Sequence, residues 1–354
     1  MDSSMLFLDP AFFFPGAAPP AEEGSYFRLR LLAELIQAGR RLVIPARPEW
    51  TTFLRDRTGL PSECWLAGPN RLSGNWGALM AFYRARHRRF SLLLTFETVG
   101  ALPMGLWAIR QFRMAGRAIL IARRPPTRAV VSAMGRFPCT VAAANRRIAQ
   151  AFTGGLYGQV DVFGGLAGAH RFDGLRPSPS PDAPVAFCVM GDLSQGWRGV
   201  SVVLRALDRL PEDVADRVRV HLVGFRSPPR IPNPRVQTYP PVPCEERGNF
   251  LRQMDVMIAP SAEEENMLET FDETVVQGML ASLPVIAFDA GTVGEKAQDG
   301  AGLTFQTDEE LASAMTALAT DPDRRRRMGE RARANALARY CWNTSDFIRR
   351  YLGS

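Results

Sequence analysis

The chain has 354 residues, a length that favours two domains over one. Its hydrophobic fraction of 46% and charged fraction of 22% exclude global disorder and predict packed cores. The net charge is +7, carried almost wholly by arginine, because Lys296 is the only lysine. Charge alone leaves nucleotides, anionic lipids and nucleic acid open as partners, and genome composition is an alternative explanation of the arginine bias.

Cysteine usage and the apolar segments favour a cytoplasmic location. The five cysteines are far apart and form no Cys-x-x-Cys pair, so neither a zinc site nor a disulfide framework is predicted. The apolar run from Met5 to Phe14 contains Asp9 and follows no basic residue, which disfavours a signal peptide. The longest apolar stretch, Leu92 to Ile109, contains Glu97 and Pro103, which disfavours a membrane span.

The first half of the chain alternates between predicted strands and helices. Met5–Leu8 predicts a buried strand, and apolar residues at helical spacing then predict a helix from about Ser25 to Ala38, which Gly39 ends. Further buried strands are predicted at Arg41–Pro45, Ser91–Phe96, Ala118–Ala122 and Thr140–Ala143.

A proline and serine run at residues 176–184 is the clearest linker, because it cannot continue a helix or a central strand. The second half then repeats the alternation, with elements predicted at Ala186–Met190, Val200–Leu210, Val218–Val223, Glu246–Met254, Val256–Ala259 and Pro284–Phe288. Two such runs predict an α/β protein with two Rossmann-like domains. The predicted domains are residues 1–175 and 185–335, on either side of the linker.

The tail is predicted to be helical. Thr307 and Glu310 form a capping box before one helix, and a basic helical segment runs from Asp323 to Tyr351. The string Asp321-Pro322-Asp323 fits a helix start, with aspartate at the cap and proline in the first turn, so no metal is inferred from it.

The segment from Pro260 to Gly302 carries most of the information about function. An apolar strand ends in Pro-Ser, and an acidic loop, a helix and a second strand follow. Units of this kind bind ligands at the carboxyl ends of their strands, where a helix N-terminus offers free N–H groups to an anion.

This segment resembles the donor-binding signature of retaining nucleotide-sugar glycosyltransferases of the GT-B fold, glycosyltransferase family 4 in particular. Glu269 matches the first glutamate of the family's Glu-x7-Glu motif, and the second falls on Gln277. Phe271 matches the family's Glu-Gly-Phe-Gly, but Thr270 and Asp272 replace its glycines and narrow the room for a ligand. Gln277 keeps hydrogen bonding to a ribose hydroxyl but lacks a carboxylate's charge.

A second motif lies at the start of the second predicted domain. The family pattern is Gly-Arg-Leu, three residues and Lys-Gly, in which the basic residues clamp the donor diphosphate. Gly191, Leu193 and Gly199 match, with one extra residue in the spacer, and Arg198 stands for the lysine, but Asp192 replaces the arginine. Because a carboxylate repels a diphosphate, that clamp is missing or supplied from elsewhere. Without the resemblance, this segment is a glycine-rich structural turn.

The resemblance implies metal-independent transfer, with retention, from a nucleoside-diphosphate sugar, UDP- or GDP-linked, to a glycan, lipid-linked or small-molecule acceptor. Glu269 would orient the sugar, and Arg198 would stabilise leaving-group charge together with the helix N-terminus. No other cofactor is implied. The implied donor-binding residues are Gly16, Gly191, Asp192, Ser194, Gly224, Thr270, Phe271, Asp272, Glu273 and Gln277. Glu97 and Arg123 are the acceptor-side candidates, and a helix at about 336–354 would cross back to the first domain.

Several alternatives stay open. Asp192, Asp272 and Gln277 also fit a degenerate homologue that binds a sugar nucleotide or a partner enzyme without turnover, and an epimerase would keep the same fold. Two stretches mix aromatic residues with arginines, Trp76 to Arg89 and Trp107 to Arg117. If helical, they would either lie on an anionic membrane at the inner face or pack against the core. Nucleic-acid binding is not expected, because the basic residues are scattered and no recognition motif accompanies them.

Overall fold

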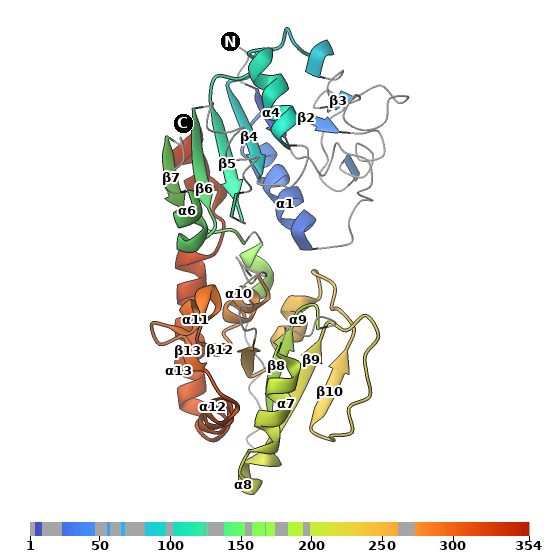
Figure 1. Cartoon of the computed structure of the whole chain (residues 1–354), viewed down its shortest axis with the longest axis vertical. Helices are drawn as coiled ribbons and strands as arrows, with labels where there is room; N and C mark the ends of the chain where they lie inside the picture. Colours follow the sequence, from blue (N-terminus) through green and yellow to red (C-terminus); the bar gives the residue numbers. More distant parts are fainter. Residues whose placement is uncertain are drawn as a thin grey trace. The chain divides into compact units, whose positions relative to one another are not determined.

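A computed structural model describes residues 4–8, 23–46, 55–56, 65–67, 82–96, 102–123, 125–126, 138–152, 158–166, 168–173, 183–193, 199–260 and 273–353. The chain divides into two compact units, residues 1–167 with 342–354 and residues 168–341. Each unit is built on its own parallel sheet (Figure 1). The first boundary precedes the proline and serine run, because a short helix before that run packs with the second unit.

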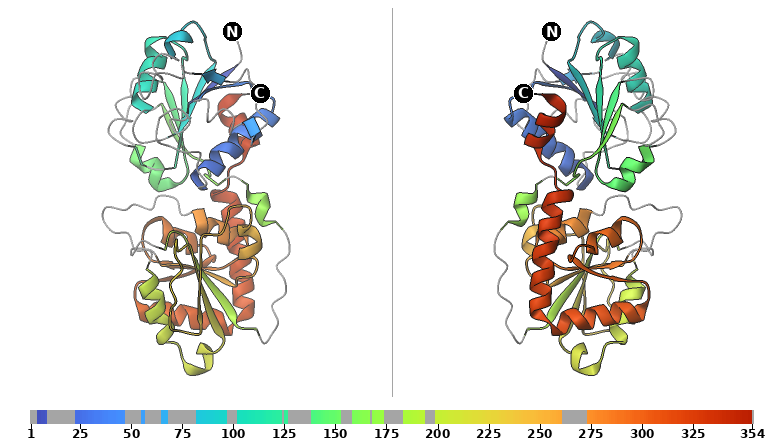
Figure 2. Two further views of the ribbon diagram at one scale, coloured as in Figure 1. Left: turned by 90° about the vertical axis from the view of Figure 1, so that its right-hand side faces the viewer. Right: turned by 90° about the vertical axis from the view of Figure 1, so that its left-hand side faces the viewer.

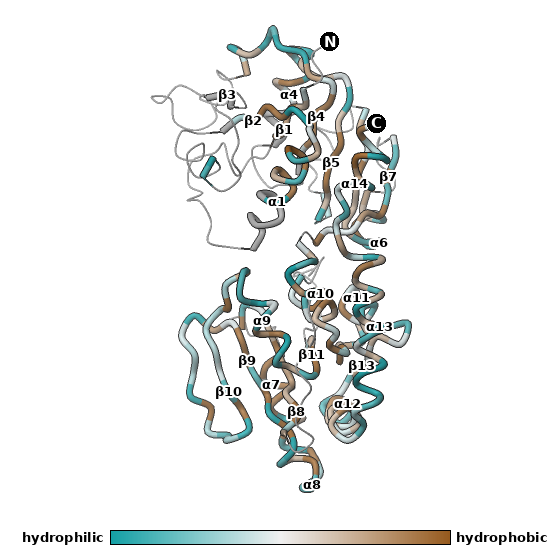
Figure 3. The backbone as a smooth tube through the Cα atoms, turned by 180° about the vertical axis from the view of Figure 1, so that it is seen from behind, coloured by the Kyte–Doolittle hydropathy of each residue, from teal (hydrophilic) through white to brown (hydrophobic). Residues whose placement is uncertain are grey.

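In its described part, unit 1 has a 7-stranded parallel sheet in the order β3-β2-β1-β4-β5-β6-β7. The strands are β1 (Met5–Leu8), β2 (Leu42–Ala46), β3 (Trp65–Ala67), β4 (Leu92–Phe96), β5 (Ala118–Ala122), β6 (Cys139–Ala143) and β7 (Gln159–Val162). The described side chains of β1, β4 and β5 are buried on both faces, which explains why these strands read as continuous apolar runs. Figure 3 shows this apolar character along β4 and β5.

The helices of unit 1 cover both faces of this sheet (Figure 2). They are α1 (Glu23–Gln37), α4 (Leu102–Gln111) and α6 (Arg146–Phe152). Leu31, Leu32 and Leu35 of α1 are fully buried, as their spacing predicts. The predicted helical stretch Trp107 to Arg117 is wrong beyond Gln111, because Arg113 adopts a left-handed conformation (φ 52°) and a turn leads into β5.

The end of the chain is part of unit 1. A short helix α14 (Thr344–Phe347) and a π-helical turn η5 (Ile348–Leu352) lie beside α1 (Figure 2). Phe163 packs edge-on against Trp342, with ring centroids 4.9 Å apart, and Trp342 lies 4.5 Å from Phe347. The Tyr351 hydroxyl donates to the Asp161 carboxylate at 3.1 Å. These contacts make the tail a structural component of the unit 1 core.

The predicted helix from Asp323 to Tyr351 is interrupted between Tyr340 and Asn343. There the chain passes from unit 2 into unit 1, and the Trp342 amide donates to the Leu166 carbonyl at 2.7 Å. The Asn343 side chain then caps α14 by accepting from the Asp346 amide at 2.9 Å.

Replacing Phe347 with alanine should destabilise the folded state of unit 1. Phe347 is fully buried, so Phe347→Ala should lower the free energy of unfolding by about 3–5 kcal/mol in denaturant titrations. Val162→Ala, at an edge-strand position that is 43% exposed, is the control and should cost less than about 1 kcal/mol. Equal effects of the two changes would contradict the assigned core role of the tail.

In its described part, unit 2 has a 6-stranded parallel sheet in the order β10-β9-β8-β11-β12-β13. The strands are β8 (Val185–Met190), β9 (Val218–Val223), β10 (Val236–Tyr239), β11 (Val256–Ala259), β12 (Val285–Phe288) and β13 (Gly302–Phe305). The chain runs from β8 to β9 and β10 on one side of the sheet, and then continues with β11, β12 and β13 on the other side. The order therefore reverses between β8 and β11.

The helices of unit 2 pack on its two faces. They are η3 (Ala169–Phe172), α7 (Val200–Asp208), α8 (Glu212–Ala215), α9 (Arg247–Leu251), α10 (Glu273–Leu280), α11 (Gly291–Ala297), α12 (Asp308–Thr320) and α13 (Pro322–Arg339). Helix α12 contacts α7 and α8, whereas α10 contacts α9 and α13. Asp321 caps α13 by accepting from the Arg324 amide at 2.8 Å, with Pro322 in the first turn, as the sequence predicts.

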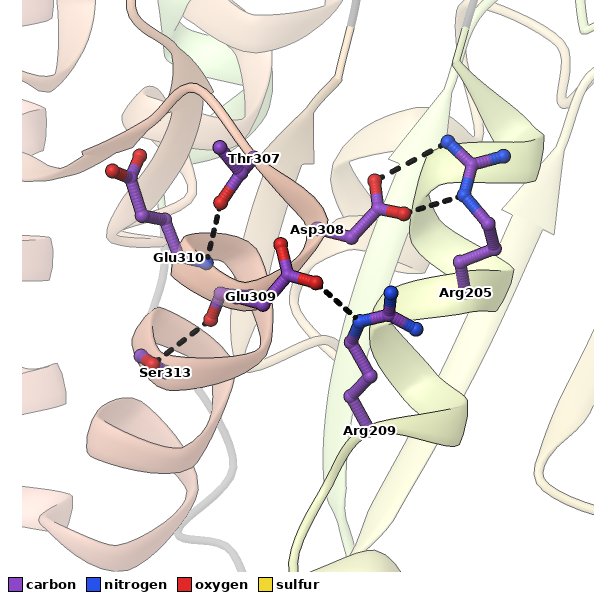
Figure 4. Close-up of polar contacts among 7 residues, drawn as sticks. All are labelled: Arg205, Arg209, Thr307, Asp308, Glu309, Glu310 and Ser313. Carbon is purple, nitrogen blue, oxygen red and sulfur yellow. Dashed lines mark hydrogen bonds and ion pairs between the residues drawn. The ribbon is translucent and has the colours of Figure 1, made fainter.

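Ion pairs join α7 to α12 at the surface (Figure 4). Arg205 bridges both carboxylate oxygens of Asp308, at 2.5 and 3.2 Å, and Arg209 pairs with Glu309 at 2.8 Å. The arginines lower the pKa of both carboxyl groups. Such exposed pairs add little stability, so the apolar residues beneath them hold the two helices together. Thr307 caps α12 by accepting from the Glu310 amide at 3.2 Å, as predicted.

Candidate functional site

The candidate site lies at the carboxyl edge of the unit 2 sheet, where the strand order reverses. Strands β8, β9 and β11 end at this edge and are followed by Gly191, Gly224 and Pro260. In open parallel sheets, ligands bind outside the carboxyl ends of the strands at such a reversal. The strand order of unit 2 alone therefore identifies this edge as the candidate ligand site.

Two glycines bring the backbone segments after β8 and β9 into direct contact. A Cβ atom on Gly224 would lie 1.6 Å from the Gly191 carbonyl oxygen, and Gly224 has a φ of 123°. The Gly191 amide donates to the Val223 carbonyl at 3.0 Å, which fixes the corner. Only glycine fits at position 224, because any side chain would overlap the neighbouring backbone.

A third glycine positions the start of α7. A Cβ atom on Gly199 would lie 2.5 Å from the Pro260 carbonyl oxygen, and the residue has a left-handed φ of 69°. Gly199 is the N-cap of α7, so the first free amides of this helix lie at the end of β11. The start of α7 is thereby brought to the edge of the sheet already occupied by the Gly191 and Gly224 corner.

Helix α10 is tied to the same edge by a buried hydrogen bond. The Thr274 hydroxyl donates to the Met190 carbonyl at 3.1 Å, so the first turn of α10 meets the end of β8. A helix N-terminus carries partial positive charge and unsatisfied amides, which stabilise a bound anion. The edge thus combines close backbone approach with the N-terminal ends of two helices.

Arg247, at the start of α9, also reaches this site. Its Nε donates to the Val242 carbonyl at 2.9 Å, and its Nη1 contacts Gln277 Oε1 at 3.4 Å. Gln277 is fully buried on α10, and Arg247 is half-buried. Burial lowers the pKa of Arg247, and the nearby Glu273 carboxylate raises it. Arg247 could not be identified from the sequence, because no motif covers it and its contacts depend on packing between α9 and α10.

The described donor-side predictions converge on this edge. Gly191 and Gly224 touch, Asp192 follows Gly191, and Glu273 and Gln277 lie in the first two turns of α10. The remaining predicted site residues lie outside the described parts of the chain: Gly16, Glu97, Ser194, Arg198, Glu269, Thr270, Phe271 and Asp272. Their placement stays a prediction.

Arg123 lies at the corresponding edge of unit 1, directly after β5. A Cβ atom on Gly165 would lie 3.7 Å from Arg123 Nε and 2.8 Å from the Ala144 side chain. The guanidinium therefore extends from β5 across the end of β6 toward the segment after β7. Its assignment to the acceptor side stays a prediction.

The described residues offer little for metal-binding or nucleophilic chemistry. Within them, no three His, Cys, Asp or Glu side chains are grouped so that they could hold a metal ion. Burial raises the pKa of the Cys139, Cys188 and Cys341 thiols to about 12, which leaves them protonated and poorly nucleophilic at neutral pH. No helix in the described ranges is both long enough and apolar enough to span a lipid bilayer.

The two Rossmann-like units define the GT-B fold. Anabaena HepE in complex with UDP superposes with a TM-score of 0.71 at 16% identity, over 99% of this chain and 98% of that one. Sucrose-phosphate synthase from Thermosynechococcus elongatus gives 0.65 at 15% identity, over 99% and 98%. Acinetobacter baumannii MurG gives 0.55 at 14% identity, over 98% of each chain. The GT-B fold predicted from the sequence is confirmed.

One sequence comparison identifies a family in the second unit, and another finds a relative. Residues 184–321 match the family described as glycosyl transferases group 1, so unit 2 carries a domain of this family. D-inositol 3-phosphate glycosyltransferase from Nocardia farcinica (strain IFM 10152) is 32% identical over 158 residues. That match covers 40% of this chain and 34% of the relative, about a third of the relative's length. The family resemblance predicted from the two motifs is confirmed.

Gly224→Ala should disrupt the candidate site. The added Cβ would collide with the Gly191 carbonyl, and the strained φ alone costs about 1–3 kcal/mol in unfolding free energy. We expect a lower melting temperature and no measurable UDP binding by calorimetry. Gly116→Ala, where a Cβ meets no atom within 4 Å, should change stability by less than about 1 kcal/mol. Wild-type UDP affinity in Gly224→Ala would show that this corner does not form the binding site.

Proposed function

We propose that this protein is a glycosyltransferase that takes a sugar from a nucleoside-diphosphate donor. The observation that carries the proposal is the glycine corner of unit 2, which lies within the matched group 1 glycosyl transferase domain. Close backbone packing at Gly191, Gly199 and Gly224, with the Thr274 bond to Met190, places the starts of α7 and α10 at one edge of the sheet, where their N-terminal amides can bind a pyrophosphate. HepE has been crystallised with UDP and with UDP-glucose, which supports a UDP-sugar as the donor.

The proposed mechanism stabilises the departing nucleotide. As the bond between sugar and diphosphate breaks, negative charge grows on the leaving oxygen. Arg198 and the backbone amides at Phe271–Glu273 stabilise that charge, and Glu269 orients the donor sugar. The reaction is proposed to retain anomeric configuration and to need no metal. The other proposed donor contacts are Gly16, Gly191, Asp192, Ser194, Gly224 and Gln277.

The acceptor is proposed to be a glycan, a lipid-linked sugar or a small molecule, with Glu97 and Arg123 of unit 1 on its side. A UDP- and glucose-bound HepE and a TarM bound to fondaparinux, alpha-GlcNAc-glycerol and UDP support acceptors that carry sugar. A cytoplasmic location is proposed from the cysteine pattern.

Glu269→Ala should abolish transfer without unfolding the protein. Because Glu269 is proposed to contact the donor sugar, the melting temperature should stay near that of the wild type while product formation falls below detection. Thermal-shift screening with UDP, GDP, ADP and TDP first selects the nucleotide, since a ligand that binds only the folded form raises the melting point. Transfer is then measured with the matching sugar nucleotides.

Glu330→Ala, at an exposed position on α13, is the control and should transfer sugar normally. A large loss of stability in Glu269→Ala would make that residue structural. Nucleotide binding by the wild type without turnover of any donor would support the degenerate-homologue alternative. Conversion of the sugar nucleotide without an acceptor would support an epimerase.

A basic surface with exposed aromatic residues lies on unit 1. Phe90 and Ala115 form a parallel bridge, which places residues 82–89 beside residues 113–117. These segments and the end of α4 contain Arg84, Arg86, Arg88, Arg89, Arg110, Arg113 and Arg117 but no aspartate or glutamate. Tyr83 and Trp107 are 45% and 55% exposed. We propose that this surface contacts anionic lipid at the inner face of the membrane, where a lipid-linked acceptor would be found.

Charge reversal on this surface should release the protein from anionic vesicles. Each arginine near such a membrane contributes roughly 1 kcal/mol, so Arg88→Glu with Arg89→Glu should reduce binding about tenfold or more. Cosedimentation with phosphatidylcholine vesicles, with and without phosphatidylglycerol, measures the effect. Arg327→Glu with Arg331→Glu on α13 is the control and should bind like the wild type. Equal binding to neutral and anionic vesicles would contradict the proposal.

A further inference from the structure

The glycine corner of unit 2 carries an acidic residue where a diphosphate would favour a basic one. Asp192 directly follows Gly191, at the position where the resembling family has a diphosphate-binding arginine. A carboxylate near a bound diphosphate raises the free energy of the complex, because like charges repel more strongly where the protein excludes water. Arg198 is then the remaining basic residue of the family motif, so a site that binds a nucleoside diphosphate needs positive charge from a further residue to replace the missing arginine.

The fold brings Arg247 to the required place. Thr274 joins the first turn of α10 to the end of β8 at Met190, and Gln277 lies three residues further along the same helix. Residues three apart lie on the same helix face, about 4.5 Å along the axis. Since Arg247 Nη1 contacts Gln277, its guanidinium meets α10 about one turn beyond Thr274, the residue that bonds to the end of β8.

Arg247 is also held firmly in this place. Its Nε bond to the Val242 carbonyl fixes the guanidinium from the loop before α9, while Nη1 meets Gln277 from α10. A half-buried guanidinium fixed by two elements loses little side-chain entropy when a ligand binds. An arginine remains protonated at neutral pH even where burial lowers its pKa.

The glutamine at position 277 preserves the positive charge of Arg247. A glutamate at this buried position would form an ion pair with Arg247 and cancel much of its field. Gln277 accepts the same contact through Oε1 without a negative charge, because arginine is only a donor. The nearby Glu273 carboxylate raises the pKa of Arg247, which burial lowers. Relative to the family pattern, the chain thus lacks the arginine after β8 and carries Arg247, at the start of α9, beside an uncharged residue at position 277.

We propose that Arg247 is a positioning residue for the donor, whose guanidinium supplies the positive charge that Asp192 cannot supply to the diphosphate. The inference deepens the proposed function and rests on it. It also assigns Gln277 a second role, the orientation of Arg247 without neutralising it.

The test measures how affinity depends on ligand charge. Full-length protein is titrated calorimetrically with UDP, UMP and uridine, and in parallel with GDP, GMP and guanosine. Arg247→Met removes the charge but keeps an apolar stem. Because hydrogen bonds to charged groups contribute about 1.5–3 kcal/mol, its affinity for the diphosphate should fall about tenfold to a hundredfold. The loss should be smaller for the monophosphate and below about twofold for the nucleoside.

Three further variants separate charge from structure. Arg247→Lys should recover part of the diphosphate affinity. Asp192→Arg in the Arg247→Met background should restore it by returning positive charge to the loop after β8. Arg252→Met, at the other end of α9, is the matched control and should bind like the wild type. If Arg247→Met fails to fold, Gln277→Glu takes its place and should weaken diphosphate binding relative to nucleoside binding.

The failures of the two proposals can be distinguished. If the wild type binds no nucleotide, the proposed function fails and this inference fails with it. If the wild type binds UDP or GDP and folded Arg247→Met binds it equally well, only the role of Arg247 is overturned. Equal losses for diphosphate, monophosphate and nucleoside would also overturn it, since a charge effect must grow with the charge of the ligand.

Discussion

The candidate site depends on the contact between two backbone segments, those after β8 and β9 in unit 2. Gly224 lies so close to the Gly191 carbonyl that no side chain fits, and Gly199 lies in the same way against Pro260. This close packing brings the start of α7 to the edge where the strand order reverses, and the N-terminal amides of a helix bind anions at such an edge. The Thr274 bond to Met190 then fixes α10 at that edge. Each later feature of the site is positioned relative to this corner.

Much of the fold could be predicted because parallel strands buried on both faces read as apolar runs. β1, β4, β5, β8, β9, β11 and β12 lie within a residue or two of their predicted bounds. Strands β3, β10 and β13 were not predicted. Two of them, β10 and β13, lie at the edges of the unit 2 sheet and are partly exposed, so their sequences lack a continuous apolar pattern. The interruption near Trp342 was missed because it depends on a hydrogen bond to Leu166, which is distant in sequence.

The site residues also divide into those marked by a local sequence pattern and those placed by contacts between distant segments. Glycine-rich turns and the start of α10 are local patterns, so Gly191, Gly224 and Gln277 could be proposed from the sequence alone. Arg247 could not, because its significance comes from packing that joins α9 to a helix that begins about 25 residues later. The replacements at Asp192 and Gln277 could be recognised in the sequence, but only as separate departures from two motifs. The contact between Arg247 and Gln277 in the structure is what suggests a connection between them.

The aromatic cluster of unit 1 sets an order of events during synthesis. Phe163 is made before unit 2, whereas its partners Trp342 and Phe347 leave the ribosome after it. Domains generally fold as units while the chain is still growing. Unit 2 can therefore complete its core while unit 1 still lacks part of its own. The earlier-made lobe must keep an apolar surface unsealed until residues 342–352 have been synthesised, which exposes that lobe to aggregation in the meantime.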